Sequence, residues 1–407
     1  MRATFLNYAR INKYNSYLQH IYYTTRQGTG KNNMNNKYFY KNLNKAAALL
    51  IVILIASSCS KKNNTPKPVT VVTAKPVTFG LIEYGTGGDS RIFMPVTKVG
   101  TQTVSYPLVF DTGSTGLTLD ATDIIPSNMI TSAGIQVTGD SVLVNGITIT
   151  NQTTTMSYGD ANAPTVEYGN LAYAYFTIGD NNGNISIKRV PFFLYYKILD
   201  GNKNPYPPHS ADIFGVGPGF SFTNKAIVSP LSIYDPGTGL TKGFKLATLN
   251  NADFTSSGQY VAGLFTAGLT DADRFSSGFV MHPLGFSSDG GYSPNIPATI
   301  TYGGNSTAAE VLFDTGTPSI TIIEDEKANS VKKSLNSLGD LANGSVVTIT
   351  TNKGFKFNYT VSATNNLTTV ENPNQSGDYR SILSIYFFVQ NEFLTDYDHN
   401  VIGLKNN

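Results

Sequence analysis

Short runs in which apolar and polar residues alternate make up much of the chain, and turn residues separate them. Residues 141–150, SVLVNGITIT, and residues 354–363, GFKFNYTVSA, are two examples. A period of two, interrupted by Asn-Gly or Gly, is typical of half-buried β-strands joined by hairpins. The pattern therefore predicts a mainly β protein, and 407 residues with 40% hydrophobic content are enough for a large core.

One segment in the C-terminal half has helical spacing instead. Within residues 321–339, Val331, Leu335 and Leu338 recur at intervals of four and three, acidic residues come early and Gly339 follows. Apolar residues at that spacing, with acids at the start and glycine at the end, predict a short helix.

The N-terminal region differs in composition from the rest. After Met34, the basic stretch 35–45, NNKYFYKNLNK, precedes the apolar run 46–58, AAALLIVILIASS, which ends at Cys59, the only cysteine. A basic segment, a short apolar run and small residues are the features of a secretory signal. The alternative is a membrane-spanning helix, but the apolar run is shorter than the roughly 20 residues that a span needs.

This arrangement resembles a bacterial lipoprotein signal, which implies that Cys59 is the lipidated first residue of the mature protein. Residues 1–58 are then a leader, with Met34 as an alternative start. We expect a lipid-anchored protein of the bacterial cell envelope, at the outer membrane, with its periplasmic or external orientation left open. Residues 59–78, rich in Lys, Asn, Thr and Pro, are predicted to be a flexible tether. A single cysteine allows no disulfide within the chain.

Charge is distributed unevenly along the chain. Eight of the 29 basic residues and none of the 27 acidic residues lie in residues 1–58, so the remainder has a formal excess of six acidic residues. Binding to nucleic acid depends on clusters of Lys and Arg that neutralise phosphates. We therefore expect no nucleic-acid partner.

The clearest chemical signal is an acidic turn that occurs twice. Residues 107–116 read PLVFDTGSTG and residues 309–318 read AEVLFDTGTP, so Asp111 and Asp314 lie 203 positions apart. A lone Asp-Thr-Gly can be an ordinary polar turn of a hairpin. Two copies, each after an apolar run that ends in Phe and each before a hydroxyl residue, favour a paired site.

Chemistry gives a reason for such a pair. Two carboxyl groups held close together share one proton, so that one is acidic and the other basic. Such a pair can deprotonate a water molecule and protonate a leaving group in one cycle. Glycine lets backbone N–H groups approach each carboxylate, and the next hydroxyl can orient its outer oxygen. The candidates for this support are Thr112, Gly113, Ser114, Thr315, Gly316 and Thr317.

Both turns resemble the active-site motifs of the pepsin-like aspartic peptidases, with FDTGST at 110–115 in the N-terminal lobe and FDTGTP at 313–318 in the C-terminal lobe. The resemblance implies a bilobal fold with a pseudo-twofold axis and a flap hairpin over a central cleft. It further implies that Asp111 and Asp314 are catalytic and that no metal or cofactor is needed. The lobes are placed at residues 79–255 and 256–407.

Other segments agree with the resemblance. Residues 153–180 are similar to the flap hairpin and the strands that follow it. Residues 211–217, ADIFGVG, resemble the strand that threads behind the first Asp turn, and residues 381–406 resemble the closing strands. On this alignment the flap residues, which would also contact the substrate, are Tyr158, Gly159 and Asp160.

Three features depart from the family's pattern. The family has a Trp that holds the flap tyrosine where this chain has Thr118, and the chain contains no Trp. In the second lobe, Ile382 and Leu383 are followed by Ser384 where glycine is usual, which leaves the support of the Asp314 turn open. Residues 59–78 are too short for the usual inhibitory pro-segment, so activation by self-cleavage is not expected.

The sequence therefore predicts a monomeric aspartic endopeptidase that acts on protein or peptide substrates. Asp160 matches a flap position at which the resemblance implies tolerance of Lys on the acyl side of the cleaved bond. One alternative is a weak or inactive pepsin-like protein that binds peptides or glycans at the cell surface, and another is a purely structural β lipoprotein.

Other hydrolase chemistries lack their starting signals. No Gly-x-Ser-x-Gly motif is present, and no His or Cys cluster has the spacing of metal ligands. The histidines of the mature chain, His209, His282 and His399, are far apart in sequence. We expect them to be surface residues or hydrogen-bonded structural residues.

Overall fold

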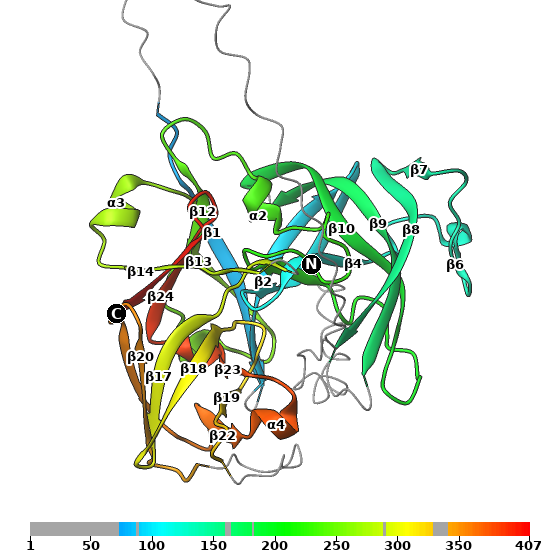
Figure 1. Ribbon diagram of the computed structural model, residues 1–407. Coiled ribbons are helices and arrows are strands. Elements are labelled where there is room, and N and C mark those ends of the chain that lie inside the picture. Colours follow the sequence, from blue (N-terminus) through cyan, green and yellow to red (C-terminus); the bar gives the residue numbers. More distant parts are fainter. Residues whose placement is uncertain (1–72, 87–88, 159–163, 181–182, 288–289, 329–340) are drawn as a thin grey trace, which may run out of the picture. The chain divides into compact units, whose positions relative to one another are not determined.

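The computed structural model describes residues 73–407 except 87–88, 159–163, 181–182, 288–289 and 329–340 (Figure 1). The described residues belong to one compact unit. Strands make up most of their regular structure, which confirms the predicted mainly β class. The predicted leader, Cys59, most of the tether, Gly159, Asp160 and the helix predicted around 331–339 all lie outside the described residues.

The larger sheet has fourteen strands, which include the first and the last strand of the described residues. The strand β1 lies near its middle, between β13 and β2. In spatial order the strands are β14 (Val280–Pro283), β25 (Val401–Asn406), β24 (Asn391–Asp396), β12 (Thr241–Leu246), β13 (Gln259–Leu269), β1 (Val77–Thr86), β2 (Asp89–Val99), β3 (Gln102–Asp111), β11 (Ile213–Val216), β4 (Thr115–Asp120), β10 (Ile185–Leu199), β9 (Thr165–Ile178), β8 (Ile147–Tyr158) and β7 (Ser141–Val144).

A second sheet of seven strands is formed by the later part of the chain and is yellow to orange in Figure 1. Its strands, in order, are β21 (Lys356–Thr360), β20 (Val346–Thr351), β17 (Ile296–Tyr302), β18 (Asn305–Phe313), β23 (Arg380–Leu383), β19 (Ile320–Glu324) and β22 (Leu367–Glu371). Two short hairpins pair β5 (Ile130–Thr131) with β6 (Gly134–Ile135) and β15 (Phe286–Ser287) with β16 (Gly291–Tyr292).

The helices of the described residues are short, and polar side chains cap several of them. The Thr270 side chain and Asp273 form a reciprocal capping box at the start of α3, which holds two of the backbone N–H groups that a helix start leaves free. The helices are α2 (Pro230–Ile233), α3 (Asp271–Phe275), α4 (Pro373–Ser376) and the 3-10 turns Ser127–Met129, Asn251–Asp253 and Ile385–Phe387. None of the described helices is long and apolar enough to cross a membrane.

The same arrangement of three strands occurs once in each sheet. In the larger sheet β11 runs parallel to β3 and antiparallel to β4, and Gly215 pairs with Asp111. In the second sheet β23 runs parallel to β18, where Leu383 pairs with Phe313, and antiparallel to β19. Each Asp turn thus connects two strands that enclose a third. The prediction that residues 211–217 thread behind the first turn is confirmed.

A buried Phe precedes each Asp and fixes the end of its strand. Phe110 packs edge-on against Phe244 and Phe265, with ring centroids 5.6 and 5.8 Å apart. Phe313 packs against Phe387 at 4.4 Å. All five phenylalanines are almost fully buried in the main core. The apolar run before each motif therefore anchors the turn to the core on which it depends for rigidity.

Candidate active site

Reciprocal hydrogen bonds between two threonines join the Asp turns. The Oγ1 of Thr112 donates to the carbonyl of Phe313 at 2.7 Å, and the Oγ1 of Thr315 donates to the carbonyl of Phe110 at 2.6 Å. In return, each hydroxyl accepts the backbone N–H of the other threonine, at 3.1 and 3.0 Å. All of these groups are buried, so the bonds are not exchanged with water. The ends of β3 and β18 are consequently held together.

The carboxylate of Asp111 is fixed by its own turn. Oδ1 accepts the N–H groups of Gly113 and Ser114 at 2.8 and 3.1 Å, and Oδ2 accepts the Ser114 hydroxyl at 2.6 Å. Asp111 is only 6% exposed. Three donors of fixed direction leave this carboxyl group a single orientation.

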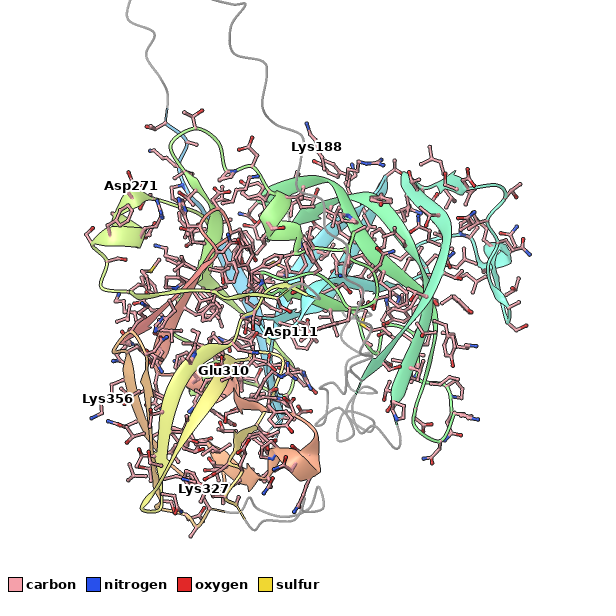
Figure 2. The ribbon with its side chains drawn as sticks, viewed as in Figure 1. Asp111, Lys188, Asp271, Glu310, Lys327 and Lys356 are labelled. Atoms are coloured by element: carbon pink, nitrogen blue, oxygen red, sulfur yellow. The ribbon has the colours of Figure 1, made fainter. Side chains whose placement is uncertain are left out.

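Asp314 has a corresponding set of contacts. Its Oδ1 accepts the N–H of Gly316 at 2.8 Å, and its Oδ2 accepts the hydroxyl of Thr317 at 2.6 Å. Asp314 is fully buried. Figure 2 labels Asp111 at the end of β3, and Glu310 on β18, the strand that leads into Asp314. Each of the six residues predicted to support the pair contacts a carboxylate or joins the two turns.

The two carboxyl groups are in direct contact. A hydrogen bond links the side chains of Asp111 and Asp314. A Cβ added at Gly316 would lie only 2.7 Å from Cγ of Asp111, so space alone requires glycine there. Burial first, and then the charge of Asp314, raise the pKa of Asp111 well above its usual range, although the bonds from Ser114 and Gly113 oppose the rise. The pair therefore retains a proton at a pH where isolated aspartates are ionised.

A buried arginine, which sequence reasoning missed, contacts the second turn. Arg91 of β2 donates from Nη1 to the carbonyl of Gly316 at 2.7 Å, and its Nε lies 3.7 Å from Asp89. Arg91 is only 5% exposed. The two residues lie 225 positions apart, and the sequence around Arg91 forms no motif that indicates this contact. Only the folded structure reveals it.

The predicted flap is present as a hairpin. The strands β8 and β9 pair in antiparallel register, and Tyr158 faces Thr165 at the end of the described ladder. Gly159 and Asp160 lie outside the described residues, and for Tyr158 only the backbone is described. The predicted contacts of these three residues with substrate remain predictions.

Thr118, in the place of the family's Trp, bonds to the strand behind the first turn. Its hydroxyl donates to the carbonyl of Ala211 at 2.8 Å and accepts the N–H of Ile213 at 3.2 Å. Beside it is a small core, distinct from the main one, which includes Ile227 packed against the Asp111 turn at Gly116. The small core consists of Leu171, Phe193, Tyr195, Ile198, Ala211 and Ile227.

Ser384 does not disturb the support of the Asp314 turn. The N–H of Asp314 donates to Leu383 at 2.9 Å, and the N–H of Ile385 donates to the carbonyl of Thr317 at 2.9 Å. Ser384 is fully buried, and its N–H lies 3.4 Å from the hydroxyl of Thr321. A hydroxyl neighbour thus gives the polar groups of this serine a partner, which burial requires.

Each histidine of the described residues has a hydrogen-bond partner. His282 is buried and contacts the hydroxyl of Thr351 at 2.8 Å. His209 and His399 contact Asp212 and Asp396, at 2.6 and 3.0 Å. In the described part of the chain, no three His, Cys, Asp or Glu side chains form a group that could hold a metal ion.

Comparison with solved structures places this geometry in a known fold. The chain is similar to the crystal structure of an aspartic proteinase from Irpex lacteus, with a TM-score of 0.51 and 18% identity over 82% of this chain and 98% of that chain. The fold is pepsin-like. A second similar structure is basic 7S globulin from soybean, with a TM-score of 0.53 and 12% identity over 82% of this chain and 96% of that chain.

Sequence comparison adds nothing to this result, since no family model matches the chain and no curated protein matches it. The predicted bilobal, mainly β pepsin-like fold class is nevertheless confirmed. At such low identities, the likeness to solved structures establishes the pepsin-like fold alone.

Proposed function

We propose that the protein is an aspartic endopeptidase in which Asp111 and Asp314 activate a water molecule between them. The observation that carries this proposal is the hydrogen bond between two buried carboxyl groups that come from turns 203 positions apart. A protein that had only to fold would gain nothing from two buried acids in contact, because each raises the free energy of ionising the other.

The chemistry follows from a pair that carries one proton. The ionised carboxylate removes a proton from water, and the protonated carboxyl group transfers its proton to the carbonyl oxygen of the peptide bond. Water attacks the carbonyl carbon, and a tetrahedral diol forms without any covalent bond to the protein. The pair then transfers its proton to the amide nitrogen and the C–N bond breaks. A hydroxyl group of the diol returns a proton to one carboxylate, which restores the singly protonated pair.

The decisive experiment measures cleavage of denatured casein at acidic pH. Asp111→Asn and Asp314→Asn should each lower cleavage by at least about 1000-fold, because the pair loses either its base or its acid. Asp325→Asn is the matched control, since Asp325 is also buried, directly after β19, but accepts the hydroxyl of Tyr302 instead. Full activity in either dyad variant, with both proteins folded, would refute the mechanism.

Substrate preference on the acyl side is assigned to the flap. We propose that the carboxylate of Asp160 favours Lys beside the cleaved bond, by pairing of opposite charges. Cleavage after Lys and after Leu should be compared in wild type and Asp160→Ala. An unchanged ratio of the two rates would remove the idea.

We propose the cellular location of the protein from the sequence of its leader. Lipidation at Cys59 would anchor the body to the bacterial outer membrane through the tether of residues 59–78. Membrane fractionation of wild type and Cys59→Ser tests this, because the variant should move to the soluble fraction. A variant that stays with the membrane would contradict a lipid anchor at this position.

A second candidate function is binding of peptides or glycans without turnover. It is favoured by the similarity to a structure named as a globulin rather than a proteinase, and by Thr118 in place of the expected Trp. The casein assay separates the two functions when binding of a statine inhibitor is measured beside it. Inhibitor binding without any cleavage by the wild type would support the binding protein.

A further inference from the structure

A buried polar cluster lies behind the first Asp turn, within the small core and at its edge. Asp212 is its centre: Oδ1 accepts the Tyr195 hydroxyl at 2.9 Å and the N–H of Asp120 at 2.8 Å. Oδ2 of Asp212 lies 2.6 Å from Nδ1 of His209. The backbone N–H of His209 in turn donates to Oδ2 of Asp120 at 3.0 Å. Both carboxylates are about 95% buried.

Among the described residues whose contacts and charges reach this cluster, His209 is the one that can carry a positive charge. Asp212 lies on its own segment, Asp120 and Asp123 face it from the end of β4 and the following turn, and the Tyr106 ring of β3 stacks on the imidazole at 4.7 Å. Tyr195 also lies near the carboxylate of Glu167 on β9. Burial alone would lower the pKa of His209, but the hydrogen bond and charge of Asp212, with Asp120 and Asp123, raise it.

The cluster is connected to Asp111 through β11. The carbonyl of Asp212 accepts the N–H of Val109, two positions before Asp111. Three residues further along, a Cβ at Gly215 would lie 2.8 Å from the Ser114 hydroxyl, the group that donates to Asp111. At about 3.3 Å per residue, the path from Asp212 to Gly215 is about 10 Å long. A shift of β11 would therefore move Ser114 relative to Asp111.

The cluster is also connected to the flap. Tyr195 pairs with Gly169 of β9, the strand that continues into the flap hairpin. A Cβ at Gly169 would lie 2.7 Å from the Cα of Tyr195, so the two strands approach closely at this point and glycine is required there. The Tyr195 hydroxyl, bound to Asp212, ties this strand pair to the segment that leads into β11.

We propose that Asp212, held by Tyr195 and His209, is a positioning residue. It fixes the position of β11 behind Asp111 and the position of the base of the flap, and it does so only while His209 is protonated. The proposal rests on the proposed peptidase function for its activity readout. A neutral His209 still donates from Nδ1, but it no longer offsets the charges of Asp212 and Asp120. Two buried carboxylates then repel each other in a medium of low polarity, and the cluster loosens.

Two pairs of variants test this. His209→Asn keeps a donor near the position of Nδ1, and asparagine tolerates the positive φ of 60° at this site, so that mainly the charge is lost. Its control is His399→Asn, because His399 contacts Asp396 through the same atom with the same i,i+3 spacing. Tyr195→Phe removes only the hydroxyl, and its control is Tyr302→Phe, whose hydroxyl donates to Asp325 at 2.6 Å.

The first readout is the pH profile of peptide cleavage. His209→Asn should lower kcat about tenfold at pH 5 with KM changed less than about twofold, and should make the alkaline fall of kcat less steep, because one ionisation is gone. His209→Lys keeps a charge and should restore most of the activity. A His209→Asn profile that coincides with wild type, or an equal loss in His399→Asn, would overturn the proposal.

The second readout needs no catalysis. Hydrogen exchange of the amides at 109–114 and 165–171, corrected for the intrinsic effect of pH, should speed up at least about fivefold in wild type as His209 loses its proton. In His209→Asn and Tyr195→Phe it should be fast at every pH, unlike in the two controls. Fast exchange in these variants without peptidase activity in wild type would keep the positioning cluster and reject the proposed function. If hydrogen exchange in these variants matched that of wild type, the positioning role of the cluster would be rejected, whether or not the protein is an active peptidase.

Discussion

At the scale of single residues, the site depends on hydroxyl groups as much as on acids. Thr112 and Thr315 each satisfy one carbonyl and one N–H of the other turn, and their hydroxyl oxygens are 3.4 Å apart. Ser114 and Thr317 repeat a second role, since each donates to the outer oxygen of its own carboxylate. The two hydroxyl positions of each motif therefore have different tasks, one between the turns and one within a turn.

Replacing the two bridging threonines by valine should reveal their mutual dependence. Thr112→Val and Thr315→Val should each lower the free energy of unfolding by about 2–3 kcal/mol, because each leaves buried polar groups without partners. The double variant should fall short of the sum by about 1 kcal/mol or more, since both changes damage one shared network. Chemical denaturation measures all three values.

A distant threonine provides the control for this cycle. Thr368 of β22 is also fully buried, and Thr112→Val combined with Thr368→Val should be additive within about 0.5 kcal/mol. If Thr112→Val and Thr315→Val were equally additive, the two turns would not support each other as the hydrogen bonds indicate.

At the scale of elements, β11 decides how precisely the first carboxylate is held. It is inserted between β3 and β4, and Gly215 faces the carbonyl of Gly116 and the hydroxyl of Ser114. A methyl group there would lie 2.6 Å from that carbonyl oxygen. Backbone cannot yield as a flexible side chain can, so the strand itself would have to move.

Gly215→Ala should therefore damage catalysis more than folding. We expect kcat to fall about 100-fold with a smaller change in KM, and the free energy of unfolding to fall by about 2 kcal/mol. Kinetics on a fluorogenic peptide and thermal unfolding give the two numbers. Gly285→Ala, at a position with nothing within 4 Å, should leave both unchanged. Wild-type kcat in a folded Gly215→Ala protein would show that β11 does not position the turn.

The sequence predicted what local pattern can encode. The strand class follows from periodicity and the two Asp turns from a duplicated motif. The course of residues 211–217 follows from the resemblance to the pepsin-like peptidases, which their glycines permit. The contacts of Arg91 with Gly316 and of His209 with Asp120 span 225 and 89 positions and leave no periodic trace. Nothing in the sequence showed that Thr118 would bond to the strand behind the turn, because a hydroxyl can pair with many partners.

At the scale of the whole molecule, several buried acids favour the protonated form. Burial first, and then Asp253, raise the pKa of Glu83 to about 8. Burial, with Glu371 and Asp378 nearby, raises the pKa of Glu324 to about 8, although a bond from Ser376 opposes it. Together with Asp111, these groups keep their protons in the folded state at a pH where the unfolded chain has released them.

Stability should therefore fall as the solution becomes less acidic. Between about pH 4.5 and pH 8 the folded protein binds more of these protons than the unfolded chain, so unfolding becomes easier as pH rises. We expect Tm to drop by at least about 5 °C from pH 5 to pH 8. His282, whose pKa burial lowers, acts the opposite way and weakens the fold as pH falls through the ordinary range of histidine.

Calorimetry across this range tests the prediction. Glu83→Gln, which cannot ionise, should flatten the slope of Tm against pH, whereas Glu392→Gln should not, since Glu392 is partly exposed and pairs with Lys405 at 2.6 Å. A Tm that rises from pH 5 to pH 8 would contradict the assignment of buried neutral acids.

The exchange of hydroxyl contacts between the two turns also limits how the protein can change over time. Each turn has a backbone N–H whose hydrogen-bond acceptor is a hydroxyl group of the other turn, so neither turn satisfies its own backbone until the two pack together. Loss of the threonine from one turn leaves a carbonyl of the other turn without its donor, so a substitution at either position affects both turns.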